Sequence, residues 1–192
     1  MRLSRTVFAL ALVLLSASSG AAPYLLCPED TLRVYTRPSE ESAQFGLVVG
    51  GDSLMICARA EGGWLGFQPG IAQAGNVGPF RLRWLRPHDS EMLDSTALAG
   101  LQLIEPLLPR AVYLMAYDTV PVMSGPDVES QELGMVPPEG WALVEARTSP
   151  GDWVLLRGRD RIPSGWVRLV AAGLNGRLDT LPEIALDREG LK

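Results

Sequence analysis

The sequence is poor in the residues that metal binding and catalysis use most often. Its 192 residues include one histidine, His88, and two cysteines, Cys27 and Cys57. These are too few for a usual structural zinc site, and a catalytic zinc site would need a second histidine. The chain also lacks a glycine-rich phosphate loop followed by lysine, and it has no Gly-x-Ser-x-Gly elbow. We therefore predict a protein without metal or cofactor that is not an enzyme. The alternative is an enzyme with an unfamiliar site.

Positive charge is also scarce. Lys192 is the only lysine, and no block of consecutive basic residues occurs anywhere in the chain. The 17 basic and 22 acidic residues give a formal net charge of −5. Because nucleic acids and anionic lipids attract positively charged surfaces, neither is an expected partner.

Apolar runs long enough to cross a bilayer are missing as well. The run Val7–Leu15 follows Arg2 and Arg5 and precedes a stretch of small residues, the layout of a secretory signal. We predict a signal peptide at residues 1–21, so the mature chain is exported, most simply to the periplasm, and has no membrane span. Its charge is then 15 − 22 = −7, since the signal holds two of the 17 basic residues. An uncleaved anchor is the alternative.

Glycine and proline, in contrast, are plentiful. Twenty glycines and fifteen prolines are spread evenly among valine, leucine and tryptophan, which indicates short strands joined by tight turns. Runs such as Thr31–Tyr35 and Leu54–Arg59 alternate polar and apolar residues, and Ala142–Arg147 repeats the pattern. We predict an all-β fold in which five or six strands close into a small barrel, because closure hides the strand edges.

The chain contains an internal duplication. A shift of 88 positions lays Pro23–Gly63 on Ala111–Gly151 without a gap, and twelve of the 41 aligned pairs are identical. One inserted residue, Asp152, then brings Trp64 opposite Trp153, and a longer insertion in the first copy brings Trp84 opposite Trp166. The predicted unit is about 60 residues long and occurs twice.

Each copy resembles a bacterial SH3 domain in four short patterns. They are a strand entering a proline turn (Val34–Ser39, Val122–Asp127), a glycine before an apolar pair (Gly46–Val48, Gly134–Val136), a glycine-tryptophan turn (Gly63–Leu65, Gly151–Val154) and a closing tryptophan strand (Trp84–Leu85, Gly165–Val167). The second copy fits better, since the first has Thr36-Arg37-Pro38 in the turn and an insertion at Gln68–Gly78. The resemblance implies half-open barrels that bind cell-wall peptides or neighbouring proteins.

These observations predict two tandem SH3-like domains, at 22–87 and 111–172, with a linker at 88–110 and a C-terminal tail at 173–192. Apolar residues recur at loosely helical spacing between Glu91 and Leu103, so the linker is expected to hold a short helix that packs the barrels together. A floppy linker is the alternative. The expected role is a binding module for peptidoglycan peptides or an envelope protein; the competing role is a structural or accessory subunit of an envelope complex.

The two cysteines both fall in the first copy. Their counterparts in the second copy are Met115 and Glu145, so both are absent there together. Together with an oxidising compartment, this predicts a disulfide between Cys27 and Cys57. The functional alternative is a reactive cysteine assisted by His88, with Asp89 or Asp94 orienting the imidazole.

Aromatic residues supply the candidate ligand contacts. The four matched tryptophans, Trp64, Trp84, Trp153 and Trp166, serve as core pillars more often than as contacts in so small a unit. Tyr35, Arg37 and Trp141 are the better candidates for exposed contacts, because the other copy has Met123, Gly125 and Ser53 at their places. A groove between the two barrels is an equally good site for a partner peptide.

Overall fold

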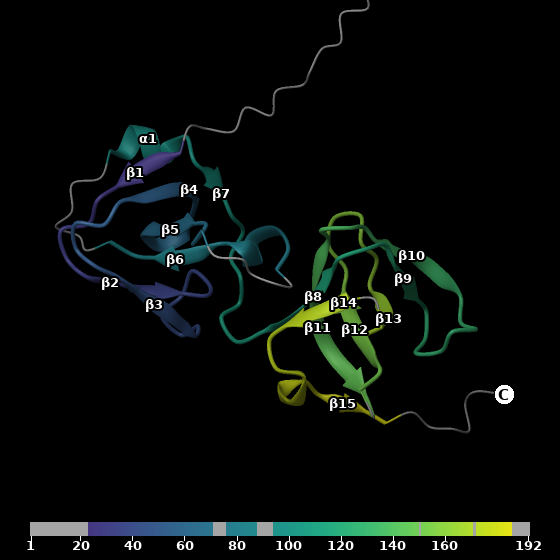
Figure 1. Cartoon of the computed structure of the whole chain (residues 1–192). Helices are drawn as coiled ribbons and strands as arrows, with labels where there is room; N and C mark the ends of the chain where they lie inside the picture. Colours follow the sequence, from purple (N-terminus) through teal and green to yellow (C-terminus); the bar gives the residue numbers. More distant parts are fainter. Residues whose placement is uncertain (1–22, 71–75, 88–93, 150, 171, 186–192) are drawn as a thin grey trace, which may run out of the picture.

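The computed structural model describes residues 23–70, 76–87, 94–149, 151–170 and 172–185. The predicted signal peptide, His88 and Asp89 lie outside the described residues. Two antiparallel sheets, one from each half of the chain, lie side by side (Figure 1). The all-β fold with two tandem β units is therefore confirmed.

The first sheet has the strand order β1-β4-β5-β6-β2-β3, with β7 paired to β4 outside this path. Its strands are β1 (Tyr24–Leu26), β2 (Leu32–Tyr35), β3 (Gln44–Val48), β4 (Leu54–Ala60), β5 (Trp64–Phe67), β6 (Arg83–Leu85) and β7 (Gln102–Leu103). Short 3-10 turns, η1 (Glu61–Gly63) and η2 (Gly78–Arg81), lie before β5 and β6.

The second sheet has the order β10-β9-β13-β12-β11-β8-β14, with β15 paired to β11 outside this path. Its strands are β8 (Val112–Ala116), β9 (Val120–Met123), β10 (Glu132–Val136), β11 (Trp141–Thr148), β12 (Trp153–Arg157), β13 (Gly165–Arg168), β14 (Ala172–Asn175) and β15 (Glu183–Ile184). The 3-10 turn η3 (Leu178–Thr180) precedes β15.

The strands follow the sequence duplication. The shift of 88 residues converts the bounds of β2 and β3 into those of β9 and β10 without any adjustment. Both hydrogen-bonded paths are open, however, ending at β3 in the first sheet and at β10 in the second. The expected closure into a barrel is therefore wrong for the described strands. β3 is an edge strand in the first unit, and β10 is the equivalent edge strand in the second.

The repeat extends further along the chain than the closing tryptophan strand. β4 pairs with β1 through Leu54–Ile56, and beyond that point it pairs in parallel with β7 through Ala58 and Arg59. β11 has the same arrangement, with β8 followed by β15. β4 and β11 thus each have two short strands along one edge. β7, which lies in the expected linker, and β14 and β15, which lie almost entirely in the expected tail, complete the two sheets.

The linker helix is short and belongs to the first unit. Helix α1 (Ser95–Ala99) begins at Asp94, whose carboxylate accepts hydrogen bonds from the backbone N–H groups of Thr96 and Ala97. Leu98 and the buried Leu101 pack against the core of the first sheet. The expected helix therefore exists, but it does not pack the two units together.

The expected disulfide is wrong because the strand register separates the two cysteines. Leu26 pairs with Leu54, so the next residue, Cys27, lies beside Ser53, and its Sγ is 3.4 Å from the Ser53 Oγ. Cys57 is four residues further along β4, about 13 Å away at strand spacing. A disulfide needs Cα atoms within about 7 Å. Both thiols are free.

Candidate functional site

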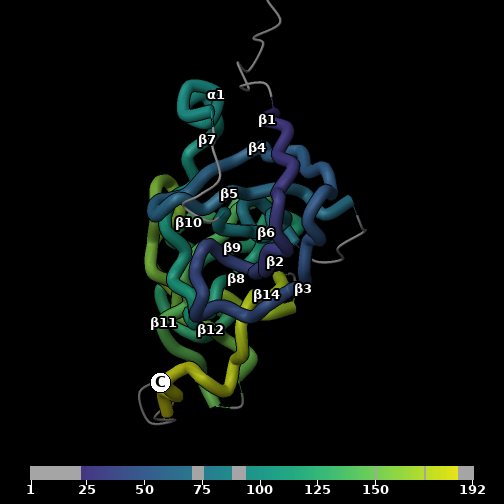
Figure 2. The backbone as a smooth tube through the Cα atoms, turned by 90° about the vertical axis from the view of Figure 1, so that its left-hand side faces the viewer, coloured from purple at the N-terminus to yellow at the C-terminus, as the bar shows by residue number. Residues whose placement is uncertain are grey.

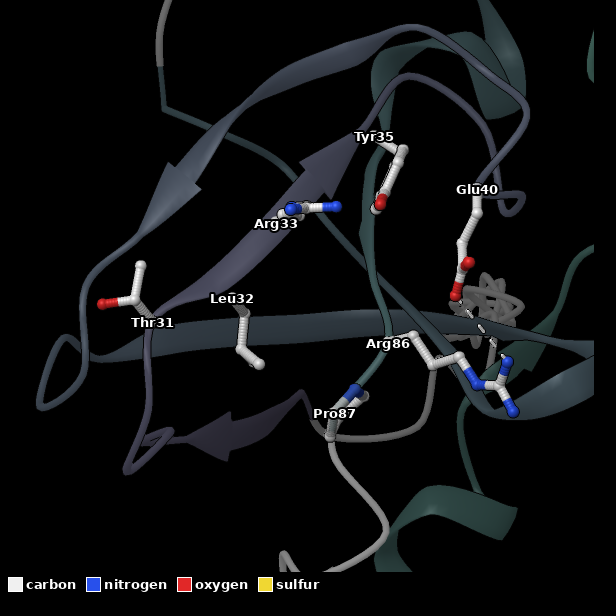
Figure 3. Close-up of a pocket in the computed structure, with 7 residues that line it drawn as sticks. All are labelled: Thr31, Leu32, Arg33, Tyr35, Glu40, Arg86 and Pro87. Carbon is white, nitrogen blue, oxygen red and sulfur yellow. Dashed lines mark ion pairs between the residues drawn. The ribbon is translucent and has the colours of Figure 1, made fainter.

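A groove of about 450 Å³ lies on the first unit, beside β2 and the end of β6 (Figure 3). Seven residues line it: Thr31, Leu32, Arg33, Tyr35, Glu40, Arg86 and Pro87. β2 supplies Leu32, Arg33 and Tyr35, and the β2–β3 loop supplies Glu40. A strand and a loop thus both contribute to the groove, and loops on a rigid scaffold carry many binding residues.

Charges of both signs meet in this groove. Arg86 reaches toward Glu40, with 4.0 Å between guanidinium nitrogen and carboxylate oxygen, and about half or more of each side chain is exposed. Such an exposed pair contributes little to stability. Both groups can therefore exchange this contact for a ligand at small cost.

Tyr35 forms part of the wall of this groove. Its ring packs edge-on against Trp64, with 5.4 Å between the centroids, and it remains half-buried at the groove. Trp64 thus supports the groove wall from inside the unit without lining it. A tyrosine held by such a partner offers a fixed apolar surface and a hydroxyl group to a ligand.

The second unit has a groove at the equivalent place. It measures about 210 Å³ and is lined by Val120, Pro121, Met123, Val128, Trp153, Arg168 and Val170. The duplication aligns Arg33 with Pro121, Tyr35 with Met123 and Glu40 with Val128. Only Arg86 keeps its charge, as Arg168. One location on the fold is therefore charged in the first copy and almost entirely apolar in the second.

The tryptophans divide between core and groove. Trp64 and Trp84 are buried in one cluster with Ala58, Ala60 and Leu82. Trp153 and Trp166 are half-buried, and of the four tryptophans Trp153 alone lines one of these two grooves. The interpretation of matched tryptophans as core pillars thus holds for the first copy.

Arg37 is not an exposed contact, and the prediction of its exposure is wrong. Only 5% of its surface is accessible, because its guanidinium lies at the junction of the units. It donates hydrogen bonds to the backbone oxygen of Leu108 and to both oxygens of Asn175, at 3.1 Å for the backbone and 2.6 Å for the side chain. Burial lowers the pKa of Arg37, and nearby Tyr113 opposes the shift.

Trp141 also lies at the junction, where it is half-buried. Its ring packs edge-on against Phe80 from the first unit at 5.5 Å and against Tyr113 at 5.6 Å. The guanidinium carbon of Arg159 lies 3.7 Å from its centroid. Trp141 therefore joins the units, and of the three expected contacts Tyr35 lines the groove of the first unit.

Sequence reasoning missed the charged residues of the first groove. Arg33 is exposed on β2, Glu40 lies in the β2–β3 loop and Arg86 directly follows β6, and charged residues are ordinary at all three places. One signal was present: the internal alignment opposes Glu40 with Val128 and Arg33 with Pro121, a change of polarity at positions that the shared fold does not require.

Neither protein-family models nor curated proteins give a match to this chain. Among the described residues, no three His, Cys, Asp or Glu side chains are grouped so as to hold a metal ion. No helix within that part of the chain is long and apolar enough to cross a bilayer.

Proposed function

We propose that this chain is an exported, non-enzymatic binding protein of the SH3-like type, whose first unit holds a short charged peptide of the cell wall. The observation that carries the proposal is the groove of Arg33, Tyr35, Glu40 and Arg86. Wall stem peptides carry carboxylates and an amino group on short side chains. Two guanidinium groups can bind the carboxylates, and Glu40 can accept from the amino group.

The size and exposure of the groove fit a short ligand. Its volume of about 450 Å³ lies within the range of pockets that bind small molecules and peptides of a few residues. Tyr35 supplies the apolar wall, and its contact with Trp64 fixes the ring before a ligand arrives. A preformed wall reduces the entropy lost on binding.

The test is retention of residues 22–192 on purified wall sacculi, with a titration of a soluble stem tripeptide in parallel. We expect the wild-type chain to bind both and the Arg33→Gln/Arg86→Gln variant to lose about ten-fold or more in affinity, because it loses charged hydrogen bonds. Arg168→Gln, the equivalent change in the second groove, is the matched control and should bind normally. Lack of binding by the wild-type chain would rule out the wall peptide as ligand.

A second candidate function is an accessory subunit of an envelope complex. The apolar groove of the second unit favours it, because Val128 is 59% exposed and Val170 is 76% exposed beside Trp153. Exposed apolar side chains gathered at one place are typical of protein interaction sites. We expect a partner envelope protein to copurify in a fixed ratio with the wild-type chain and not with Val170→Glu. Equal copurification with both would argue against this role.

A further inference from the structure

A third groove runs along the junction between the two units. It measures about 440 Å³ and takes its walls from the β2–β3 loop of the first unit, the linker, and the segment after β14 of the second unit. In Figure 2, which looks from the side of the first unit, β2 and β3 lie in front of the second unit, and Arg37 in the loop between them bonds to Asn175 at the end of β14. The lining residues that carry charge are Arg37, Glu41, Arg110 and Arg177.

The guanidinium of Arg37 at this groove is bonded to oxygens of neutral groups. Its hydrogen bonds go to two backbone oxygens and one amide oxygen, and its guanidinium carbon lies 5.0 Å from the Tyr113 ring centroid. None of the ion pairs among the described residues includes Arg37. A buried cation compensated only by dipoles is costly, and such groups cluster at binding sites.

Two further arginines stand at the rim. Arg110 is 81% exposed and lies 3.7 Å from a carboxylate oxygen of Glu41, while Arg177 is 80% exposed and bonds to Asp179 at 2.6 Å. Both side chains are long and solvated, so both can turn toward a ligand. The lining has three positive charges and one negative charge in a chain whose net charge is −5. This groove is therefore a positive region on an acidic protein.

We propose that the junction groove binds a compact anion, a carboxylate or phosphate group, as a site separate from the peptide groove of the first unit. The anion would approach Arg37 and supply the missing negative charge. Arg110 and Arg177 would bind it from the rim, with the planar, two-pronged geometry that guanidinium groups offer to both kinds of anion. Because the walls come from both units, a bound anion would also hold the units in one orientation.

The test uses isotope-labelled chain of residues 22–192, titrated with inorganic phosphate and, separately, with succinate, while backbone amide shifts are recorded. We expect saturable shifts at residues 175–180. The Arg110→Gln/Arg177→Gln variant should bind about ten-fold more weakly or worse, because it loses charge-assisted hydrogen bonds. Both arginines are exposed, so the fold should tolerate the change. Arg33→Gln/Arg86→Gln removes the same amount of charge from the other groove and serves as the control.

Saturation that is lost in the junction variant and kept in the control supports the site. The response to phosphate or to succinate then identifies which anion it prefers. Absence of saturable shifts with both probes overturns the proposal, and so does an equal loss in both variants, which would indicate only a general charge effect. The control variant also keeps the two proposals apart, because it removes the peptide groove and leaves the junction groove intact.

Discussion

Gly66 on β5 lies directly against the Trp84 ring. A Cβ at this position would be 3.0 and 3.1 Å from two carbons of that ring and 3.2 Å from the Cβ of Ala58. Trp84 is fully buried, so it has little room to shift. We expect Gly66→Ala to lower the free energy of unfolding by about 1–3 kcal/mol, as overpacking does. Urea denaturation measures the difference.

Gly46 on β3 provides the control for this substitution. It also lies in a strand, but a Cβ built there would meet nothing within 4 Å. Gly46→Ala should therefore be neutral or slightly stabilising, because alanine restricts the unfolded chain. Equal destabilisation by both substitutions would mean that strand backbone, and not the Trp84 contact, determines the cost at Gly66.

The two thiols should react at different rates. Cys27 is exposed, whereas Cys57 is half-buried, and burial raises the pKa of its thiol. Because the thiolate is the reactive form, a raised pKa leaves Cys57 less reactive at a given pH. We expect iodoacetamide to modify Cys27 first in the native protein, and modification of Cys57 to accelerate as the pH rises through its pKa. Peptide mapping by mass spectrometry distinguishes them.

The same experiment checks the covalent state. Denaturation without reductant should make both cysteines available, because the register of β1 and β4 keeps them apart. Recovery of a peptide linked through Cys27 and Cys57 after periplasmic expression would contradict this register. The sequence could not exclude the expected disulfide, because spacing alone does not reveal the register that puts Cys27 beside Ser53, four residues before Cys57. Cys57 itself occupies a β-bulge toward β5, as position 145 does in β11 toward β12.

At the scale of elements, β15 is held by few interactions. Its pairing to β11 includes a hydrogen bond from the Arg147 N–H to the Pro182 oxygen and an ion pair between Arg147 and Glu183 at 2.6 Å. The pair is only partly exposed, and we assign it about 1 kcal/mol. Glu183→Gln should therefore speed hydrogen exchange at the Arg147 amide about five-fold. Exchange measured by NMR detects this local opening.

Glu145→Gln is the matched control. Glu145 also lies on β11 and bonds to Arg157 at 2.6 Å, but this pair holds β11 to β12 and not to β15. It should leave exchange at Arg147 unchanged. If both variants accelerate exchange equally, β15 opens together with the whole sheet and not on its own.

The elements divide into those that local pattern determines and those that it does not. Alternating runs such as Leu32–Tyr35 predict β2 and its counterpart, since burial alternates along them as in any half-buried strand. β7 and β15 have two residues each, and all four are exposed. β7 pairs with the part of β4 that β1 does not reach, and β15 pairs with the part of β11 that β8 does not reach. Such a strand depends on the pairing of other strands, so its own residues do not predict it.

At the scale of the whole molecule, Phe80 is central to the junction. It is 1% exposed and lies 5.2 Å from the Tyr113 ring centroid and 5.5 Å from that of Trp141. Phe80→Ala should remove about 3–5 kcal/mol of packing. We expect the two units of this variant to tumble with separate correlation times and to unfold in two steps. NMR relaxation and calorimetry measure both properties.

Phe45→Ala is the control, because Phe45 is 40% exposed and belongs to the same unit. It should leave the common tumbling intact. Single-body tumbling of the Phe80→Ala variant would show that Arg37 and its hydrogen bonds are sufficient to join the units. The sequence predicted two units, yet it could not place Arg37 or Trp141 at their junction. Residues that join the two copies need not be repeated in both copies. The internal alignment therefore shows that Arg37 and Trp141 differ from their counterparts, but it does not show what they contact.

The junction joins two unlike surfaces. The first unit contributes Arg37 and Phe80, and the second contributes Tyr113 and Trp141. Head-to-tail contacts of this kind can continue without limit, adding copies into a filament. Here the second unit has Gly125 in place of Arg37. A further copy placed against the second unit would find no such arginine, so this one difference disfavours end-to-end addition of further copies.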